Sequence, residues 1–215
     1  MPRSAWSRKL SKTADMRGGG EKFVITKDNM KELKEELQKA IREIPKFDEL
    51  RNHIDITVTN EGLRIELTES EAGMFFDSGS AKMSPGGGDL VALLAQELSK
   101  LPNKIAIEGH TDSKRYPPTA LYTNWELSAD RANAARRLMQ SHGLGNDQVT
   151  QVRGFADQRL RKPDTPQDPS NRRISLIVQY VSKAASEEPP ATGEQEKSEA
   201  GKNKPAAESS PKEHR

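Results

Sequence analysis

The chain has 215 residues, of which 34 are basic and 32 acidic, so its formal net charge is only +2. This length suits one compact domain with terminal segments, and a charge so close to zero does not demand nucleic acid or an anionic membrane surface as a partner. Cysteine is absent, which excludes disulfides, thiolate metal sites and a cysteine nucleophile.

Residues 1–27 are predicted to form a flexible basic leader. They carry scattered Lys and Arg side chains and a glycine run at 18–20, and they show no helical or strand period. The longest apolar run of the chain, LVALLA at 90–95, is far shorter than the roughly 20 residues that cross a bilayer. We therefore expect no membrane-spanning segment and no export signal in the sequence as written.

Residues 28–50 are predicted to contain an amphipathic linker helix, with Asp28 as its N-cap and Pro45 as its stop signal. Its apolar residues recur at helical spacing on one stripe: Met30, Leu33, Leu37, Ala40, Ile41 and Ile44. Such a stripe needs a partner, which is either the rest of the domain or a second copy of the helix. Of these two we favour the second copy, in a homodimer.

Residues 51–182 are predicted to form an α+β domain. Strands are expected where apolar residues alternate or cluster, at 53–59, 63–67, 104–110, 150–156 and 173–181. One helix is expected from Pro85, which follows the N-cap residue Ser84, and another over 124–143, where Gly143 marks the end. The order α, ββ, α, β, α, β, β predicts a sandwich in which helices pack on one face of a mixed β-sheet.

Residues 183–215 are predicted to be a disordered tail. They include no Val, Ile, Leu, Met or aromatic residue and are dominated by Ala, Glu, Lys, Ser and Pro. A segment of this composition cannot bury enough apolar surface to fold alone.

The stretch EGHTD at 108–112 offers polar side chains at a strand end, and three kinds of site were weighed for it. The four histidines, His53, His110, His142 and His214, show no paired metal-ligand spacing, so no metal or other cofactor is predicted. We expect His110 to be hydrogen-bonded and to hold the loop. Ser113 lies nearby, but no G-x-S-x-G elbow or oxyanion hole is recognisable, so no catalytic residue is predicted.

Basic residues gather in the second half of the chain: Arg131, Arg136, Arg137, Arg153, Arg159, Arg161, Lys162, Arg172 and Arg173. A nucleic-acid groove is one interpretation, but aromatic residues make up only 5% of the chain and Phe155 alone is interleaved with the cluster. A solvated helix face is the second interpretation. Recognition of a smaller anion by a fixed guanidinium is the third.

Four motifs follow one another over roughly residues 54–181: IEGHTD, NWELSADRANAARRLM, GFAD and NRRISLIV. In this order and with these gaps they resemble the OmpA-like peptidoglycan-binding domain. The loop after HTD is lengthened and holds KRYPP, and the core is preceded by a helix and FFDSGSAKM. Both features are similar to the periplasmic part of the MotB family of flagellar stator proteins.

The resemblance implies a pocket for the diaminopimelate residue of the peptidoglycan stem peptide. In it, Asp112 would accept the ligand's ammonium and Arg131 would bind its carboxylate. Asn124 and Thr111 would supply polar contacts, and Arg172 would be a second basic group at the rim. Two plainer interpretations stay open: Asp112 as an Asx turn closing the strand, and Arg131 as an exposed helix residue.

The resemblance also implies a function. It predicts a non-enzymatic anchor that grips peptidoglycan in the periplasm as part of a flagellar stator, with a homodimeric state and a MotA-like channel partner. MotB-like proteins carry an N-terminal transmembrane helix, which this sequence does not show, so inner-membrane attachment is expected only of a full-length member. The alternative is a general cell-envelope tether of the outer-membrane-protein type. No nucleic acid is expected as a partner.

Overall fold

The computed structural model describes residues 26–180, so the predictions for residues 1–25 and 181–215 lie outside the described part. Its helices and strands, in chain order, are α2 (Met30–Arg42), β1 (Ile54–Val58), β2 (Gly62–Thr68), α3 (Pro85–Leu98), β3 (Ile105–His110), α4 (Asn124–Ser141), β4 (Val149–Gly154) and β5 (Arg173–Gln179). Short 3-10 turns lie at Pro45–Phe47, Arg51–His53 and Pro169–Asn171. Within residues 26–180, no helix is both long and apolar enough to cross a membrane.

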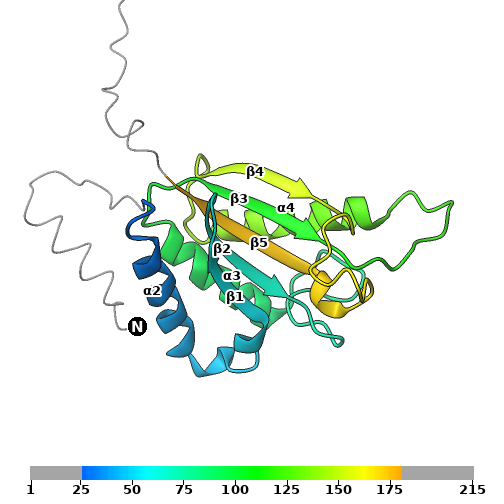
Figure 1. Cartoon of the computed structure of the whole chain (residues 1–215), viewed down its shortest axis with the longest axis horizontal. Helices are drawn as coiled ribbons and strands as arrows, with labels where there is room; N and C mark the ends of the chain where they lie inside the picture. Colours follow the sequence, from blue (N-terminus) through cyan, green and yellow to red (C-terminus); the bar gives the residue numbers. More distant parts are fainter. Residues whose placement is uncertain (1–25, 181–215) are drawn as a thin grey trace, which may run out of the picture.

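The strands form one sheet in the order β1-β2-β5-β3-β4, in which only β3 and β4 pair in parallel. Helices α3 and α4 pack together over one face of this sheet, and α2 lies beside α3 along the β1 edge (Figure 1). The apolar sides of the helices and of this face of the sheet form a single core. The predicted α+β sandwich with helices on one face of a mixed sheet is therefore confirmed.

Helices α3 and α4 begin where local sequence signals predict. The Ser84 hydroxyl accepts a hydrogen bond from a backbone N–H of the first turn of α3, and Pro85 takes the first helical position. Thr123 and Glu126 form a reciprocal capping box at the start of α4. After α4 the chain turns at Gly143, whose φ of +102° suits glycine because it has no Cβ.

Helix α2 is shorter than predicted, and its apolar stripe already has a partner. The helix ends at Arg42 because Ile44, which precedes Pro45, adopts an extended conformation (φ −107°, ψ 104°). The residue at its N-cap position is Asn29, not Asp28. Four stripe residues are buried against the domain: Met30, Leu33, Leu37 and Ile41. The domain itself therefore covers the stripe, and not the second copy of the helix that we favoured, so the stripe no longer supports the predicted homodimer.

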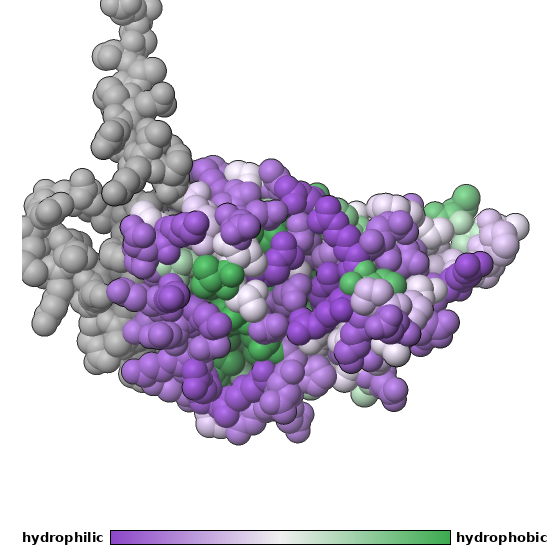
Figure 2. Space-filling model, in the orientation of Figure 1, coloured by the Kyte–Doolittle hydropathy of each residue, from purple (hydrophilic) through white to green (hydrophobic). Residues whose placement is uncertain are grey.

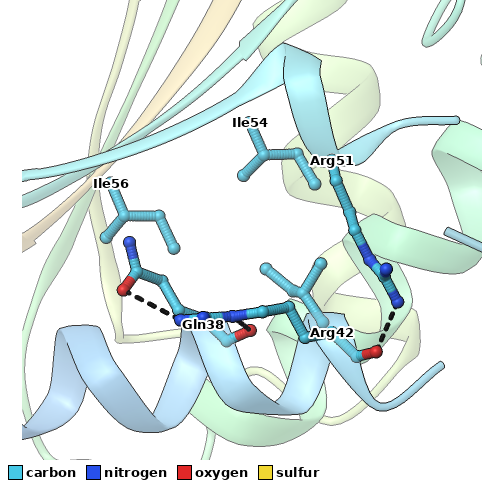
Figure 3. Close-up of a pocket in the computed structure, with 6 residues that line it drawn as sticks. Gln38, Arg42, Arg51, Ile54 and Ile56 are labelled. Carbon is cyan, nitrogen blue, oxygen red and sulfur yellow. Dashed lines mark hydrogen bonds between the residues drawn. The ribbon is translucent and has the colours of Figure 1, made fainter. Parts of the chain in front are cut away.

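The edge strand β1 follows its predicted alternation only in part. Ile56 is buried, but Val58 is 41% exposed and lines a second hollow together with Lys34 and Gln38 of α2. Between α2 and β1 lies a hollow of about 300 Å³ into which Ile54 and Ile56 point (Figure 3).

The polar rim of this hollow is engaged within the protein. Arg42 donates to the Gln38 carbonyl, and Arg51 donates to the Arg42 carbonyl and pairs with Asp48 at 2.7 Å. Two arginines and no acid line the hollow itself. It therefore lacks the charge of each sign that a zwitterionic ligand needs.

The face of the sheet opposite the helices carries paired charges. Glu108 accepts hydrogen bonds from Arg64 and Arg153, each at 2.9 Å, while Glu66 pairs with Arg161 at 2.8 Å and with Arg173 at 3.1 Å. The space-filling view of the side on which the strands lie in front is mostly hydrophilic over the sheet (Figure 2). Each of these two glutamates is shared by two arginines, so the pairs offset part of the positive charge on this face, which weakens the nucleic-acid interpretation.

Candidate ligand-binding site

The strand order brings three charged residues together at one end of the strands of the sheet. Both β2 and β3 run antiparallel to β5, which lies between them, so β2 and β3 end where β5 begins. Glu69 follows β2, Asp112 lies two residues after β3, and Arg172 directly precedes β5. All three line a cavity of about 260 Å³ at this end.

Asp112 is almost fully buried and has two partners. One carboxylate oxygen accepts a hydrogen bond from Arg172 Nη1 at 2.7 Å, and the other accepts the backbone N–H of Lys114 at 3.2 Å. The second contact forms the Asx turn that was one interpretation of Asp112. This turn does not prevent Asp112 from contacting a ligand as well. Since a carboxylate has about four lone-pair positions, Asp112 can still accept a cation. Arg172 donates to the Ser70 carbonyl as well, so it holds Asp112 rather than standing alone at the rim.

Arg131 projects from α4 into the same cavity and is only 3% exposed, so the alternative interpretation of Arg131 as an exposed helix residue is wrong. Its Nε donates to the Ser80 carbonyl at 2.8 Å and its Nη2 to the Asp77 carbonyl at 3.3 Å. The guanidinium lies 5.0 Å from the centre of the Phe76 ring. Burial lowers the pKa of Arg131, which nearby Glu69 counteracts, and arginine stays charged. Three of its five N–H groups remain for a ligand.

Asn124 and Thr111 differ in what they can offer to a ligand. Asn124 donates to the carbonyls of Asp112 and Lys114, at 3.1 and 3.0 Å, so both of its N–H groups hold the loop. Thr111 is 1% exposed, lines the cavity, and its buried hydroxyl oxygen has no hydrogen-bond partner. A buried unpaired hydroxyl costs free energy, which a ligand bound in the cavity would recover.

Several cavity residues were not predicted from the sequence. The buried carboxylate of Glu69 accepts backbone N–H groups of the loop that follows it, including those of Met74 at 2.5 Å and Phe76 at 2.8 Å. The signal was an acid two residues after a predicted strand, as for Asp112. Lys114 and Tyr116 of the KRYPP loop also line the cavity. They were not predicted because they lie far in sequence from Glu69 and Arg172 on the other side of the cavity.

His110 does not make the hydrogen bonds that were predicted for it. Both ring nitrogens are buried without a hydrogen-bond partner, and the ring stacks on Phe155 with centroids 5.2 Å apart. The nearest carboxylate oxygen, on Glu108, is 3.8 Å from Nε2, which is too long for a hydrogen bond. Burial lowers the pKa of His110, which keeps the ring neutral at pH 7. Within residues 26–180, no group of three or more His, Asp or Glu side chains could hold a metal ion.

A mixed sheet with helices on one face, and a cavity at one end of its strands that holds a buried acid and a buried guanidinium, define an OmpA-like domain. The OmpA family profile matches residues 75–174, a span that includes α3, β3, α4, β4 and the cavity residues of the EGHTD and ADR motifs. The chain belongs to the OmpA family.

Two proteins of Escherichia coli and one solved structure show which members of this family the chain is similar to. Motility protein B of Escherichia coli (strain K12) is 39% identical over 155 residues, which are 72% of this chain and 50% of that protein. The putative truncated flagellar export/assembly protein LafU of the same strain is 37% identical over 152 residues, 71% of either chain. The chain thus spans half the length of motility protein B. In fold, the periplasmic domain of Helicobacter pylori MotB matches with a TM-score of 0.52 at 18% identity, over 61% of this chain and 92% of that one.

Proposed function

We propose that this domain binds peptidoglycan without cutting it, and that it recognises the diaminopimelate residue of the stem peptide. The observation that carries the proposal is the pair formed by Asp112 and Arg131, which are buried, oppositely charged and share one cavity. Each keeps unused hydrogen-bonding capacity. The far end of diaminopimelate bears an amine and a carboxylate on one carbon, so it requires one fixed charge of each sign.

In this arrangement the residues have different roles. Asp112 accepts the ligand's ammonium, Arg131 donates to its carboxylate, and the Thr111 hydroxyl supplies a further polar contact. Arg172 orients the Asp112 carboxylate, and Asn124 holds the loop that carries it. No step of the proposal needs a nucleophile or a metal.

At the level of the whole protein, we infer an anchor that fixes a flagellar stator to the cell wall. The similarity to motility protein B supports this role. It implies a homodimer in the periplasm, attached to the inner membrane and associated with a MotA-like channel protein. Membership of the OmpA family fits a general cell-envelope tether equally well, so the stator role depends on the relatives and not on the pocket.

Titration of the folded protein with a soluble diaminopimelate-containing muropeptide tests the pocket. Asp112→Asn and Arg131→Met each remove one charged partner, worth roughly 1.5–3 kcal/mol, so affinity should fall about tenfold to a hundredfold. Since the two residues contact groups on the same carbon of the ligand, the double variant should lose less than the sum of the two. Asp164→Asn and Arg137→Met remove the same charges at exposed positions and should bind like the wild type.

Circular dichroism of every variant separates binding from folding. Wild-type affinity in both Asp112→Asn and Arg131→Met would refute the pocket. Unfolding of both would show that these residues are structural. Incubation with purified sacculi tests the non-catalytic part of the proposal, because release of soluble fragments would reveal hydrolysis.

A further inference from the structure

The loop between β3 and α4 exposes apolar side chains that the domain does not use for its core. This loop protrudes from the body of the protein (Figure 1), and its tip carries a small hydrophobic patch among more polar residues (Figure 2). Leu121 is 97% exposed, Trp125 53% and Tyr122 39%. Within residues 26–180, Val58 is the only other large hydrophobic side chain with comparable exposure. Apolar groups gathered at one exposed place indicate a binding surface.

Hydrogen bonds hold the Tyr122 ring and the helix turn that carries Trp125. The Tyr122 hydroxyl donates to Asp130 of α4 at 2.9 Å. Burial and this hydrogen bond raise the pKa of Tyr122 to about 12, so the hydroxyl keeps its proton. The capping box of Thr123 and Glu126 fixes the first turn of α4, to which Trp125 belongs. An aromatic ring that is already held by a hydrogen bond, as Tyr122 is, loses less conformational entropy when it binds.

The exposed surface continues into the proposed peptidoglycan pocket. Residues 114–117 of the same loop line the cavity, and Tyr116 is one of them. Asn124, which lines the cavity, directly precedes Trp125 in α4. The exposed side chains therefore lie, in sequence, between two segments that line the cavity.

We propose that Leu121, Tyr122 and Trp125, joined to the pocket by Tyr116, form a platform that binds sugar rings of the glycan strand. The inference rests on the proposed function. In peptidoglycan the stem peptide is attached to an N-acetylated sugar, and two residues separate that sugar from diaminopimelate. At about 3.3–3.6 Å per extended residue, the first sugar lies on the order of 10 Å from the pocket. The C–H faces of sugar rings are apolar and match flat aromatic and aliphatic side chains.

A lipid surface is the competing partner for exposed apolar groups with Lys114 and Arg115 nearby. The platform favours the sugar on two grounds. It is continuous with a cavity suited to the peptide that the sugar carries, and Tyr122 is tied to the carboxylate of Asp130, which would repel anionic headgroups.

Calorimetric titration of the full chain with two peptidoglycan fragments tests the platform. One fragment is the stem tripeptide ending in diaminopimelate, and the other is the same tripeptide on its disaccharide. The wild type should bind the disaccharide form about threefold to tenfold more tightly, the gain typical of one aromatic contact. Tyr122→Ala with Leu121→Ser should abolish this gain and leave tripeptide affinity unchanged. Tyr122→Phe, which keeps the ring, and Val58→Ser, an exposed apolar control on β1, should retain the gain.

The outcomes separate this inference from the proposed function. Equal affinity of the wild type for both fragments overturns the platform and leaves the pocket standing. Loss of tripeptide binding in the platform variant also overturns it, because these residues would then support the pocket. Failure of the wild type to bind either fragment removes the proposed function itself. If the wild type instead sedimented with phosphatidylglycerol vesicles and Leu121→Ser did not, the partner of the platform would be a lipid surface and not a sugar.

Discussion

Replacing Glu108 with glutamine should make the stability of the domain less sensitive to acid. Glu108 lies on β3, an interior strand of the sheet, and its side chain is only 1% exposed. Burial alone would raise its pKa, but the nearby His110 and the guanidinium groups of Arg64 and Arg153 outweigh burial and lower the pKa from 4.5 to about 2. We attribute the lowering mainly to the two arginines, each at 2.9 Å, because His110 is too distant for a hydrogen bond.

The size and sign of the effect follow from this pKa. A pKa lowered from 4.5 to about 2 corresponds to roughly 3 kcal/mol, at about 1.4 kcal/mol for each tenfold change in proton affinity. Because the folded-state value is the lower one, this stabilisation is present above pH 4.5 and is lost as the pH falls towards 2. Glu108→Gln removes the charge at every pH. Its free energy of unfolding should therefore be lower than that of the wild type by up to about 3 kcal/mol at pH 7, and the difference should shrink towards pH 2.

Urea denaturation of both proteins, followed by circular dichroism at intervals from pH 7 to pH 2, measures this difference. Glu49→Gln is the matched control, because Glu49 is an exposed acid on the short connection after α2. It should follow the wild type at all pH values. A gap between Glu108→Gln and the wild type that stayed constant with pH would refute the reasoning, since the loss would then come from altered packing and not from the charge.

Two further predictions concern packing. Leu33→Glu with Leu37→Glu places two carboxylates in the core, where both leucines are 2% exposed, so the double variant should lower the free energy of unfolding by more than about 4 kcal/mol. Urea denaturation measures this loss. If the variant stayed folded and light scattering showed that it had changed from a dimer to a monomer, α2 would be a dimer contact instead. Gly109→Ala would bring a methyl group to 2.0 Å from the Ser128 carbonyl oxygen of α4, so it should lower the free energy of unfolding by about 2 kcal/mol or more. Gly88→Ala is the control, because its methyl group would meet only Leu138 at 3.7 Å, and it should leave stability unchanged or raise it. Thermal melts in which Gly109→Ala was the more stable variant would contradict the close approach of β3 and α4.

The sequence predicted most of the secondary structure because its signals are local. The alternation of Leu63, Ile65 and Leu67 places all three in the core, as expected. The caps of α3 and α4 involve side chains within three residues of the helix starts they stabilise. The end of α2 was missed by two residues, although Pro45 was recognised, because the residue before a proline also leaves the helical conformation.

The sequence could also propose Asp112 and Arg131 as a pair, through the motifs that contain them, but the surroundings of each depend on tertiary structure. Asp112 pairs with Arg172 across 60 residues because β3 and β5 are neighbours in the sheet. Arg131 is buried because the loop at 77–80 closes over it and accepts its hydrogen bonds. No pattern within a few residues of either position encodes these contacts.

The same distinction holds for α2 and for the basic residues. Periodicity showed that α2 has an apolar stripe, but a stripe fits a second helix or a sheet face equally well, and only the packed structure shows that the domain covers it. Composition showed a basic cluster, but whether a positive charge is free depends on acids brought beside it by strand order, as Glu108 is beside Arg64 and Arg153. Local period and capping are thus determined by neighbouring residues, whereas burial and charge pairing are decided by which distant strands lie side by side.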